Sequence, residues 1–218
     1  MITLAFLGGT GDQGRGLARR LALAGHPVVI GSRSAERAAG VATDLAASLP
    51  AGAEVSGAVN LDAARQADLV VVAVPWEGHA ALLAEVAVAL AGKIVVDCVN
   101  PLGFDGQGAF ALTVEEGSAA EQAAGLLPDS RVVAAFHHVS AVLLLDPAVD
   151  SLDTDVLVLG DDREATDTVQ ALVAEIPGMR GIYAGRLRNS GQVEALTANL
   201  ISVNRRYKAH AGLRVTDV

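Results

Sequence analysis

The sequence has few of the residues that would point to a disulfide-bonded, metal-binding or nucleic-acid-binding protein. Cys98 is its only cysteine, so no internal disulfide can form and a thiolate metal site is not expected. It carries 16 lysines and arginines against 25 aspartates and glutamates, and a net charge of −9 does not attract phosphate backbones. We therefore expect no metal and no nucleic-acid partner, and we expect any anionic ligand to be held locally.

Aromatic side chains and long apolar runs are also scarce. Aromatic residues make up 3% of the chain, so aliphatic residues and alanine must fill the core that a 51% hydrophobic composition allows. No apolar run approaches the roughly 20 residues that cross a bilayer. Residues 1–7 lack the basic region of a signal peptide and are predicted to form a strand. These features predict a cytoplasmic protein without membrane association.

Strands and helices are predicted to alternate through the first half of the chain. Apolar runs predict buried parallel strands at 2–7, 27–30, 68–74 and 93–97. Helical spacing predicts helices at 14–24, at 34–48, and from Pro75 to about Gly92. In the first helix the apolar side chains share one face, which leaves Arg15, Arg19 and Arg20 mostly off it. This alternation is typical of an α/β fold with a doubly wound, Rossmann-type parallel sheet.

The second half is less regular. Residues 98–117 show no clear period, and a connection of this length inside a compact domain is more often functional than idle. Strands are predicted again at 131–136, 155–159 and 181–184, and helices at 162–176 and 189–210. We expect a nucleotide-binding domain over 1–184. We expect residues 185–218 to form a C-terminal helical segment that completes the substrate cleft and contributes to an oligomer interface.

A glycine-rich loop joins the first strand to the first helix. Gly9 permits the tight turn, Gly11 lets a pyrophosphate approach the backbone, and Gly14 lets helix and strand pack closely. The helix start offers free N–H groups and a positive dipole end. In the alternative interpretation these glycines form only a structural turn. The position favours a dinucleotide site built from Gly9, Thr10, Gly11, Asp12, Gln13 and Gly14.

The end of the second strand indicates which dinucleotide binds. Sites for NAD usually place an acidic residue there, whereas this chain has Ser32 and Arg33. A serine hydroxyl and a guanidinium can bind the 2′-phosphate of NADP, which an acid would repel. Arg37, one helical turn later, could close over the same phosphate or the adenine. The alternative is that both arginines are ordinary solvated charges.

Further candidates follow the ends of the later strands, where open α/β sheets bind ligands. Trp76, the only tryptophan, could wall the nicotinamide pocket or could simply cover core. His137 could be structural, or it could hydrogen-bond a ring carbonyl. No nucleophile triad, paired carboxylates or Tyr-x-x-x-Lys pair is visible. The cleft is predicted to contain Val74, Pro75, Trp76, Asn100, Pro101 and His137.

The sequence resembles the NADPH-dependent reductases of coenzyme F420 over essentially its whole length. The resemblance rests on the glycine loop, on Gly31-Ser32-Arg33, on Val74-Pro75-Trp76-Glu77, on His137 with Ala141, and on Asn189-Ser190 with Val193-Glu194-Leu196-Thr197. It implies direct hydride transfer between NADP(H) and a deazaflavin, coenzyme F420, as co-substrate. It also implies a homodimer or higher homo-oligomer. The segment from His137 through Val139 to Ala141 is assigned to the cleft of the second ligand.

Two other functions stay open from the residues alone. One is an NADPH-dependent reductase of the same shape that acts on an imine, a flavin or ferric iron. The other is an NADP-sensing regulatory protein without turnover. Hydride transfer to a deazaflavin would distinguish an F420 reductase from both of these alternatives. Because the cofactors carry this chemistry, we expect His137 to orient the second ligand and not to act as an obligatory general acid.

Overall fold

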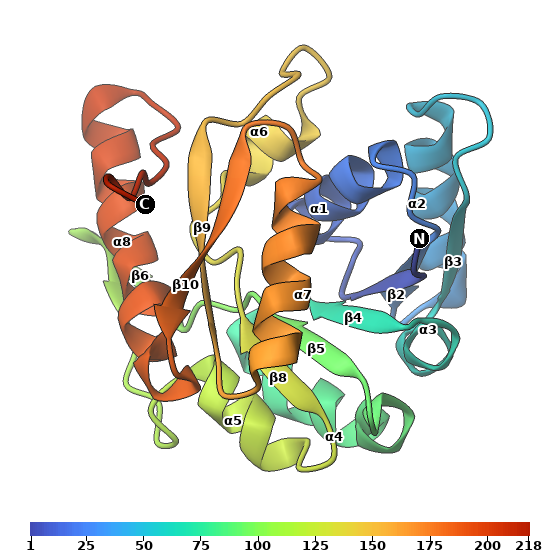
Figure 1. The fold of residues 1–218 in the computed structure, drawn as a ribbon, viewed down its shortest axis with the longest axis horizontal. Helices are drawn as coiled ribbons and strands as arrows, with labels where there is room; N and C mark the ends of the chain where they lie inside the picture. The colour runs from blue at the N-terminus through green and yellow to red at the C-terminus, as the bar shows by residue number, and fades with distance from the viewer.

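A single sheet of eight strands runs through the molecule, which a computed structural model describes over all 218 residues (Figure 1). Its strands lie in the order β10-β9-β8-β5-β4-β1-β2-β3. The six from β3 to β8 pair in parallel, in the order of the dinucleotide-binding Rossmann sheet. The predicted fold class is therefore confirmed. The strands are β1 (Leu4–Leu7), β2 (Val28–Ser32), β3 (Val55–Val59), β4 (Leu69–Val72), β5 (Ile94–Asp97), β8 (Arg131–Ala134), β9 (Thr154–Gly160) and β10 (Met179–Gly185).

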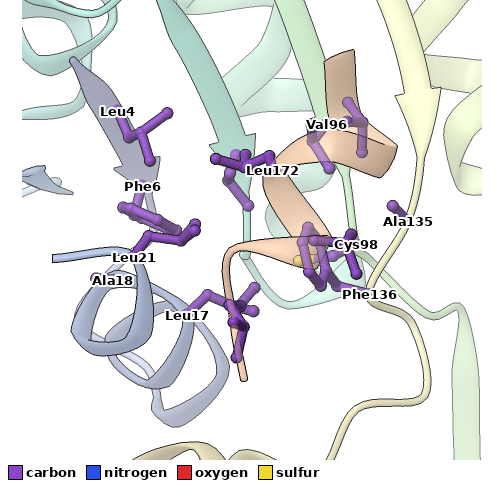
Figure 2. Packing of buried hydrophobic residues seen from close by; sticks show 14 of the residues in the cluster. Leu4, Phe6, Leu17, Ala18, Leu21, Val96, Cys98, Ala135, Phe136 and Leu172 are labelled. Carbon is purple, nitrogen blue, oxygen red and sulfur yellow. The ribbon is translucent and has the colours of Figure 1, made fainter. Parts of the chain in front are cut away.

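Helices cover both faces of this sheet. Alternate strand residues point to opposite faces, so Leu4 and Phe6 join one core cluster while Ala5 and Leu7 join another. Figure 2 shows Leu17 and Leu21 of the first helix near Leu4 and Phe6. The first face is covered by α1 (Asp12–Leu23), α2 (Ala35–Ala47) and α7 (Arg163–Ala174). The second is covered by α3 (Asn60–Gln66), α4 (His79–Leu90) and α5 (Ala119–Leu126).

Most predicted elements are present, and the local caps explain where they begin. Ser34 accepts a hydrogen bond from the Arg37 amide and starts α2, while Asp162 does the same for α7. Gly25 follows α1 with a positive φ of 99°, as a C-terminal glycine should. The sequence did not predict β3, α3, α5 or the short helix α6 (Ala141–Leu145).

The segment 98–117 is more ordered than its sequence predicts. It holds an antiparallel hairpin of β6 (Leu102–Asp105) and β7 (Gly108–Ala111), separate from the main sheet. The hairpin lies beside the last helix, α8 (Ser190–Tyr207), which follows the 3₁₀ turn η2 (Leu187–Asn189) (Figure 1). No helix of the protein is long and apolar enough to cross a membrane.

The two last strands run against the direction of the six-stranded core. β9 pairs antiparallel with β8, and β10 pairs parallel with β9. Only the end of β9 pairs with β8, so its start extends past the carboxyl edge of the sheet. There Asp155 accepts bonds from Arg180 and Arg214 and from the Val215 amide. These bonds fix the chain that follows α8, and they lower the pKa of the Asp155 carboxyl.

Two arginines of α1 are buried, contrary to the prediction that they lie mostly off the packed face. Arg19 and Arg20 are both less than a tenth exposed. The guanidinium of Arg20 donates to four backbone carbonyls around α6, those of Leu143, Leu144, Asp146 and Val149. The carbonyls at the end of a helix lack partners within it, and a guanidinium has enough donors to serve several of them. Arg20 thus fastens α6 to α1.

Candidate active site

The glycine loop lies tightly against the ends of β1 and β2. The Gly9 amide donates to the carbonyls of Phe6 and Gly31, each at 3.0 Å. A Cβ on Gly9 would lie 2.6 Å from the Phe6 carbonyl oxygen, and one on Gly14 only 2.7 Å from the Gly9 Cα. No side chain fits at either position. No side chain caps the start of α1, so its first N–H groups are available to an anion.

The other loop residues lie at the rim of this helix start. Thr10 is half-buried, and Gly11 has no atom closer than 3.7 Å to a Cβ placed on it. Asp12 is exposed and pairs with Arg15 at 2.8 Å. The arginine therefore balances a carboxylate that would otherwise weaken the attraction of the helix start for phosphate.

The end of β2 carries the residues that the sequence predicts to bind a 2′-phosphate. Ser32 is buried, and its hydroxyl accepts from the Ser34 amide at 3.3 Å. Arg33 and Arg37 are exposed, and neither side chain makes a hydrogen bond or ion pair within the chain. Both guanidinium groups are therefore free to bind an anion beside the glycine loop.

Trp76 stands after β4 and stacks on a buried histidine. It begins the 3₁₀ turn η1 (Trp76–Gly78) and is half-buried. Its ring centroid lies 5.5 Å from that of His79, with 32° between the ring planes. Val74 is half-buried against the glycine loop, and Pro75 is exposed. Val74 thus lies next to the glycine loop, and Pro75 and Trp76 follow it in the chain; that they line the nicotinamide pocket stays a prediction.

Behind Trp76 lies a buried polar pair that sequence reasoning missed. His79 Nε2 is 2.6 Å from Asp97 Oδ2, and both side chains are fully buried. His79 Nδ1 is 2.9 Å from the Gln122 side-chain oxygen, whose amide nitrogen is turned away toward Glu116. Both ring nitrogens thus face acceptors. Burial is the largest single influence and opposes protonation of His79. The hydrogen bond and charge of Asp97, the bond to Gln122 and the charge of Glu194 together outweigh it and raise the His79 pKa.

Glu194 connects this pair to the C-terminal helix. From α8 its carboxylate accepts the amides of Ala119 and Ala120, at 2.9 and 3.2 Å, and so caps the start of α5. Burial raises the pKa of Glu194 to about 7. Next to it the hydroxyls of Ser118 and Ser190 are 2.9 Å apart. The Asn-Ser and Val-Glu segments of the sequence are therefore where α8 attaches to the sheet domain.

The floor of the site is the segment that follows β8. Phe136 has a positive φ of 64°, unusual for a bulky residue, and its side chain lies in the core (Figure 2). Gln13 donates to the Phe136 carbonyl at 3.2 Å. Asn100 and Thr197 both donate to the His137 carbonyl, at 2.7 and 3.0 Å. The glycine loop, the end of β5 and α8 therefore meet at these two carbonyls.

Several buried polar atoms at this floor have no partner. They are the side-chain oxygen of Asn100 and both ring nitrogens of His137. Unpaired buried polar atoms are costly, so they indicate groups that a ligand can satisfy. Burial lowers the pKa of His137 to about 4, which leaves the ring neutral near pH 7. A neutral imidazole can both donate and accept one hydrogen bond.

The remaining predicted residues lie at varying distances from this floor. Val139 packs into the core, and half-buried Ala141 begins α6 against α1. Pro101 is buried at the base of the hairpin, where its carbonyl accepts from Leu112. His138 is buried without partners and lines a separate cavity of about 30 Å³, room for one water molecule. Cys98 is buried in the core, and burial raises the pKa of its thiol.

Comparison with known proteins gives a consistent picture. Residues 3–101 match the family described as NADP oxidoreductase coenzyme F420-dependent. The chain is 40% identical over 221 residues to the F420-dependent NADP reductase of Methanothermobacter marburgensis, covering 99% of this chain and 98% of that protein. A crystal structure of a candidate F420-dependent NADP reductase from Arthrobacter sp. FB24 superposes with a TM-score of 0.84. It is 32% identical, over 99% of this chain and all of that one.

A further relative is longer. The chain is 34% identical over 193 residues to the metalloreductase STEAP3 of Rattus norvegicus, which covers 88% of this chain but 36% of that protein.

Proposed function

Because the chain belongs to the family of coenzyme F420-dependent NADP reductases, we propose that the site between the glycine loop and α8 is where it transfers hydride between NADP(H) and F420. The protein is an oxidoreductase, and its cofactors are NADP and F420 as co-substrate. The observation that carries this conclusion is 40% identity across nearly the whole of both chains.

We assign NADP to the side of the glycine loop. The uncapped start of α1 fits the pyrophosphate, and the close contact of Gly9 with Gly14 leaves room for it there. The unpaired guanidinium of Arg33 and the hydroxyl of Ser32 fit the 2′-phosphate. The nicotinamide would then lie near Trp76 and the partnerless oxygen of Asn100.

The chain itself positions the reacting rings and excludes water. The two bound cofactors supply the hydride donor and acceptor, so no side chain needs to form a covalent bond. Asn100 and Thr197 both donate to the His137 carbonyl and so fix its backbone, which supports an orienting role for its buried imidazole in the proposed site. The neutral ring there can donate one hydrogen bond to the second ligand.

The activity is tested by mixing the purified protein with F420 and NADPH and following the absorbance of F420. Reduction of F420 at a rate well above that of an imine, a free flavin or ferric citrate supports the proposal. Preferred turnover of ferric citrate would favour the metalloreductase function. Binding of NADPH without turnover of any acceptor would indicate the sensing function.

The role of His137 predicts a modest effect of its removal. Loss of an orienting contact should lower single-turnover hydride transfer by about 5- to 30-fold in His137→Ala, and His137→Asn should recover part of it. Because burial lowers the His137 pKa to about 4, its titration should give no break in the rate between about pH 5 and 8. A loss of roughly 100- to 10,000-fold would instead identify an obligatory acid–base catalyst.

A homo-oligomer and a cytoplasmic location both stay predictions. The apolar stripe of α8 supports the first, because Leu196 and Leu200 are only half-buried and Val203 is 37% exposed within one chain. Leu200→Asp with Val203→Asp should weaken self-association by at least about 100-fold in analytical ultracentrifugation, since an interface would bury unpaired charge. The control is Val88→Asp, on the 93% exposed Val88 of α4. An unchanged oligomeric state would place the interface elsewhere.

A further inference from the structure

A groove of 690 Å³ lies between the β6–β7 hairpin and the second half of α8, outside the site described above. We refer to it as the hairpin groove. One wall is the hairpin from Phe104 to Ala109, including its turn. The other wall is formed by Ile201, Ser202, Arg205 and Arg206 of α8. Figure 1 shows β6 beside α8, at the edge of the molecule.

The hairpin groove is positively charged on a chain of net charge −9. Arg205 and Arg206 are exposed and make no ion pair or hydrogen bond with their side chains. The one acidic residue of the groove is Asp105, whose carboxylate accepts the amides of Gln107 and Gly108 in the hairpin turn. Two free guanidinium groups therefore face one carboxylate that is already hydrogen-bonded, which suits an anionic ligand.

Both walls of the groove start at the proposed hydride-transfer site. β6 follows directly after Asn100 and Pro101, and the hairpin base is closed by the bond from Leu112 to Pro101. On α8, Thr197 contacts the His137 carbonyl, and Arg205 comes two turns later. At about 1.5 Å per helical residue, the groove arginines lie roughly 12 Å along α8 from the floor of the site. The residues from Pro101 to Asp105 span a similar length, roughly 13 Å at about 3.3 Å each.

We propose that the hairpin groove binds the anionic side chain of coenzyme F420, an inference that rests on the proposed function. The deazaflavin ring of this coenzyme carries a ribityl chain that leads to a phosphodiester and then to glutamate carboxylates. With the ring in the cleft, such a chain leaves between the hairpin and α8, and its negative groups reach Arg205 and Arg206. The phosphates of NADP are assigned above to the start of α1 and the end of β2, so the hairpin groove is not needed for them.

The test compares F420 with the tail-less deazaflavin, which has only the ring and the ribityl chain. Binding of each to the protein with NADP⁺ is measured by deazaflavin fluorescence, and KM is measured in parallel. Removing both exposed contacts in Arg205→Ala with Arg206→Ala should weaken F420 binding by roughly 5- to 30-fold. Binding of the tail-less compound should change by less than about 2-fold. The difference between the two ligands should shrink as salt rises.

Arg163→Ala is the matched control, because Arg163 is an almost fully exposed arginine on α7. It should leave the affinity for both ligands unchanged. Equal affinity of the unmodified protein for F420 and the tail-less compound would overturn the proposal, and so would equal losses for both in the double variant. Dissociation of an oligomer by the same variant would instead make the groove an interface between copies. Failure of the proposed function would appear separately, as absence of turnover with either deazaflavin.

Discussion

Asp97→Ala should lower the free energy of unfolding by about 3–5 kcal/mol, the usual cost of removing one partner of a buried ion pair. Asp97 is fully buried, and its two carboxylate oxygens accept from His79 and from the Val99 amide. Alanine leaves both donors buried without an acceptor. For a chain of this size the loss corresponds to a fall in Tm of roughly 6–20 °C, measurable by circular dichroism.

Two further variants show whether the loss of stability in Asp97→Ala comes from breaking the pair of His79 and Asp97. Asp62→Ala removes an exposed carboxylate that pairs with Arg65, and it should cost no more than about 1 kcal/mol. His79→Ala together with Asp97→Ala should cost less than the sum of the two single changes, because neither charge is then left alone. If Asp97→Ala were no more harmful than Asp62→Ala, the pair would not stabilise the fold.

Glu194 gives this region a pH dependence of defined sign. Its folded-state pKa is raised from 4.5 to about 7, so the folded state binds the proton more tightly than the unfolded chain. The stability contributed is therefore complete below about pH 4.5 and is lost as the pH rises to about 7. The raised pKa of His79 acts in the same direction. His137 and His138 act in the opposite direction, because burial lowers both of their pKa values from 6.5 to about 4 and the unfolded chain binds their protons more tightly. The Glu194 contribution is therefore measured as a difference between two proteins. In urea unfolding, the stability of the unmodified protein relative to Glu194→Gln should fall as the pH rises from about 4.5 to about 7.

Arg33→Ala should weaken NADPH binding by roughly 10- to 150-fold, the equivalent of about 1.5–3 kcal/mol for a charged hydrogen bond. Arg33 is exposed and unpaired at the end of β2, so its removal disturbs no contact within the chain. NADH lacks the 2′-phosphate and should lose much less affinity. Isothermal titration with both dinucleotides measures the difference.

Arg163→Ala serves again as a control, since it removes an exposed arginine from α7. It should leave both affinities unchanged. Equal losses of NADPH and NADH in Arg33→Ala would mean that Arg33 binds a part common to both dinucleotides, and the assignment of the 2′-phosphate to it would be wrong. Arg37→Ala then shows whether the second guanidinium contributes.

The elements that could be predicted are those whose conformation is set by residues close together in the sequence. The strand at 2–7, the glycine loop and the helix after it are each specified by neighbouring residues, and the structure confirms them. The helix α5 could also have been found, because Ser118 and Glu121 have the spacing of a capping box. The hairpin at 102–111 could not, since its strands are short and rich in glycine.

The missed residues depend on contacts between distant segments. His79 and Asp97 are 18 residues apart and meet only because β4 and β5 pair in the sheet. Arg20 is buried only because α6, more than 120 residues later, presents its carbonyls there. The reversed direction of β9 is likewise not encoded in its own apolar run. Sequence alone predicts that charged residues such as Asp97 and Arg20 are exposed, because their buried partners become visible only in the tertiary structure.

Helix α1 contacts the segment after β8 at three successive turns. Gln13 bonds to the Phe136 carbonyl, a Cβ on Gly16 would lie 2.6 Å from Leu144 Cβ, and Arg20 bonds around α6. Helix α1 begins at the dinucleotide loop, so these contacts also fix the distance between that loop and His137. Hydride transfer is sensitive to errors of about 1 Å in the approach of its reactants. A substitution at Gly16 or Arg20 that leaves the protein folded can therefore still slow hydride transfer, because it shifts the dinucleotide loop relative to His137.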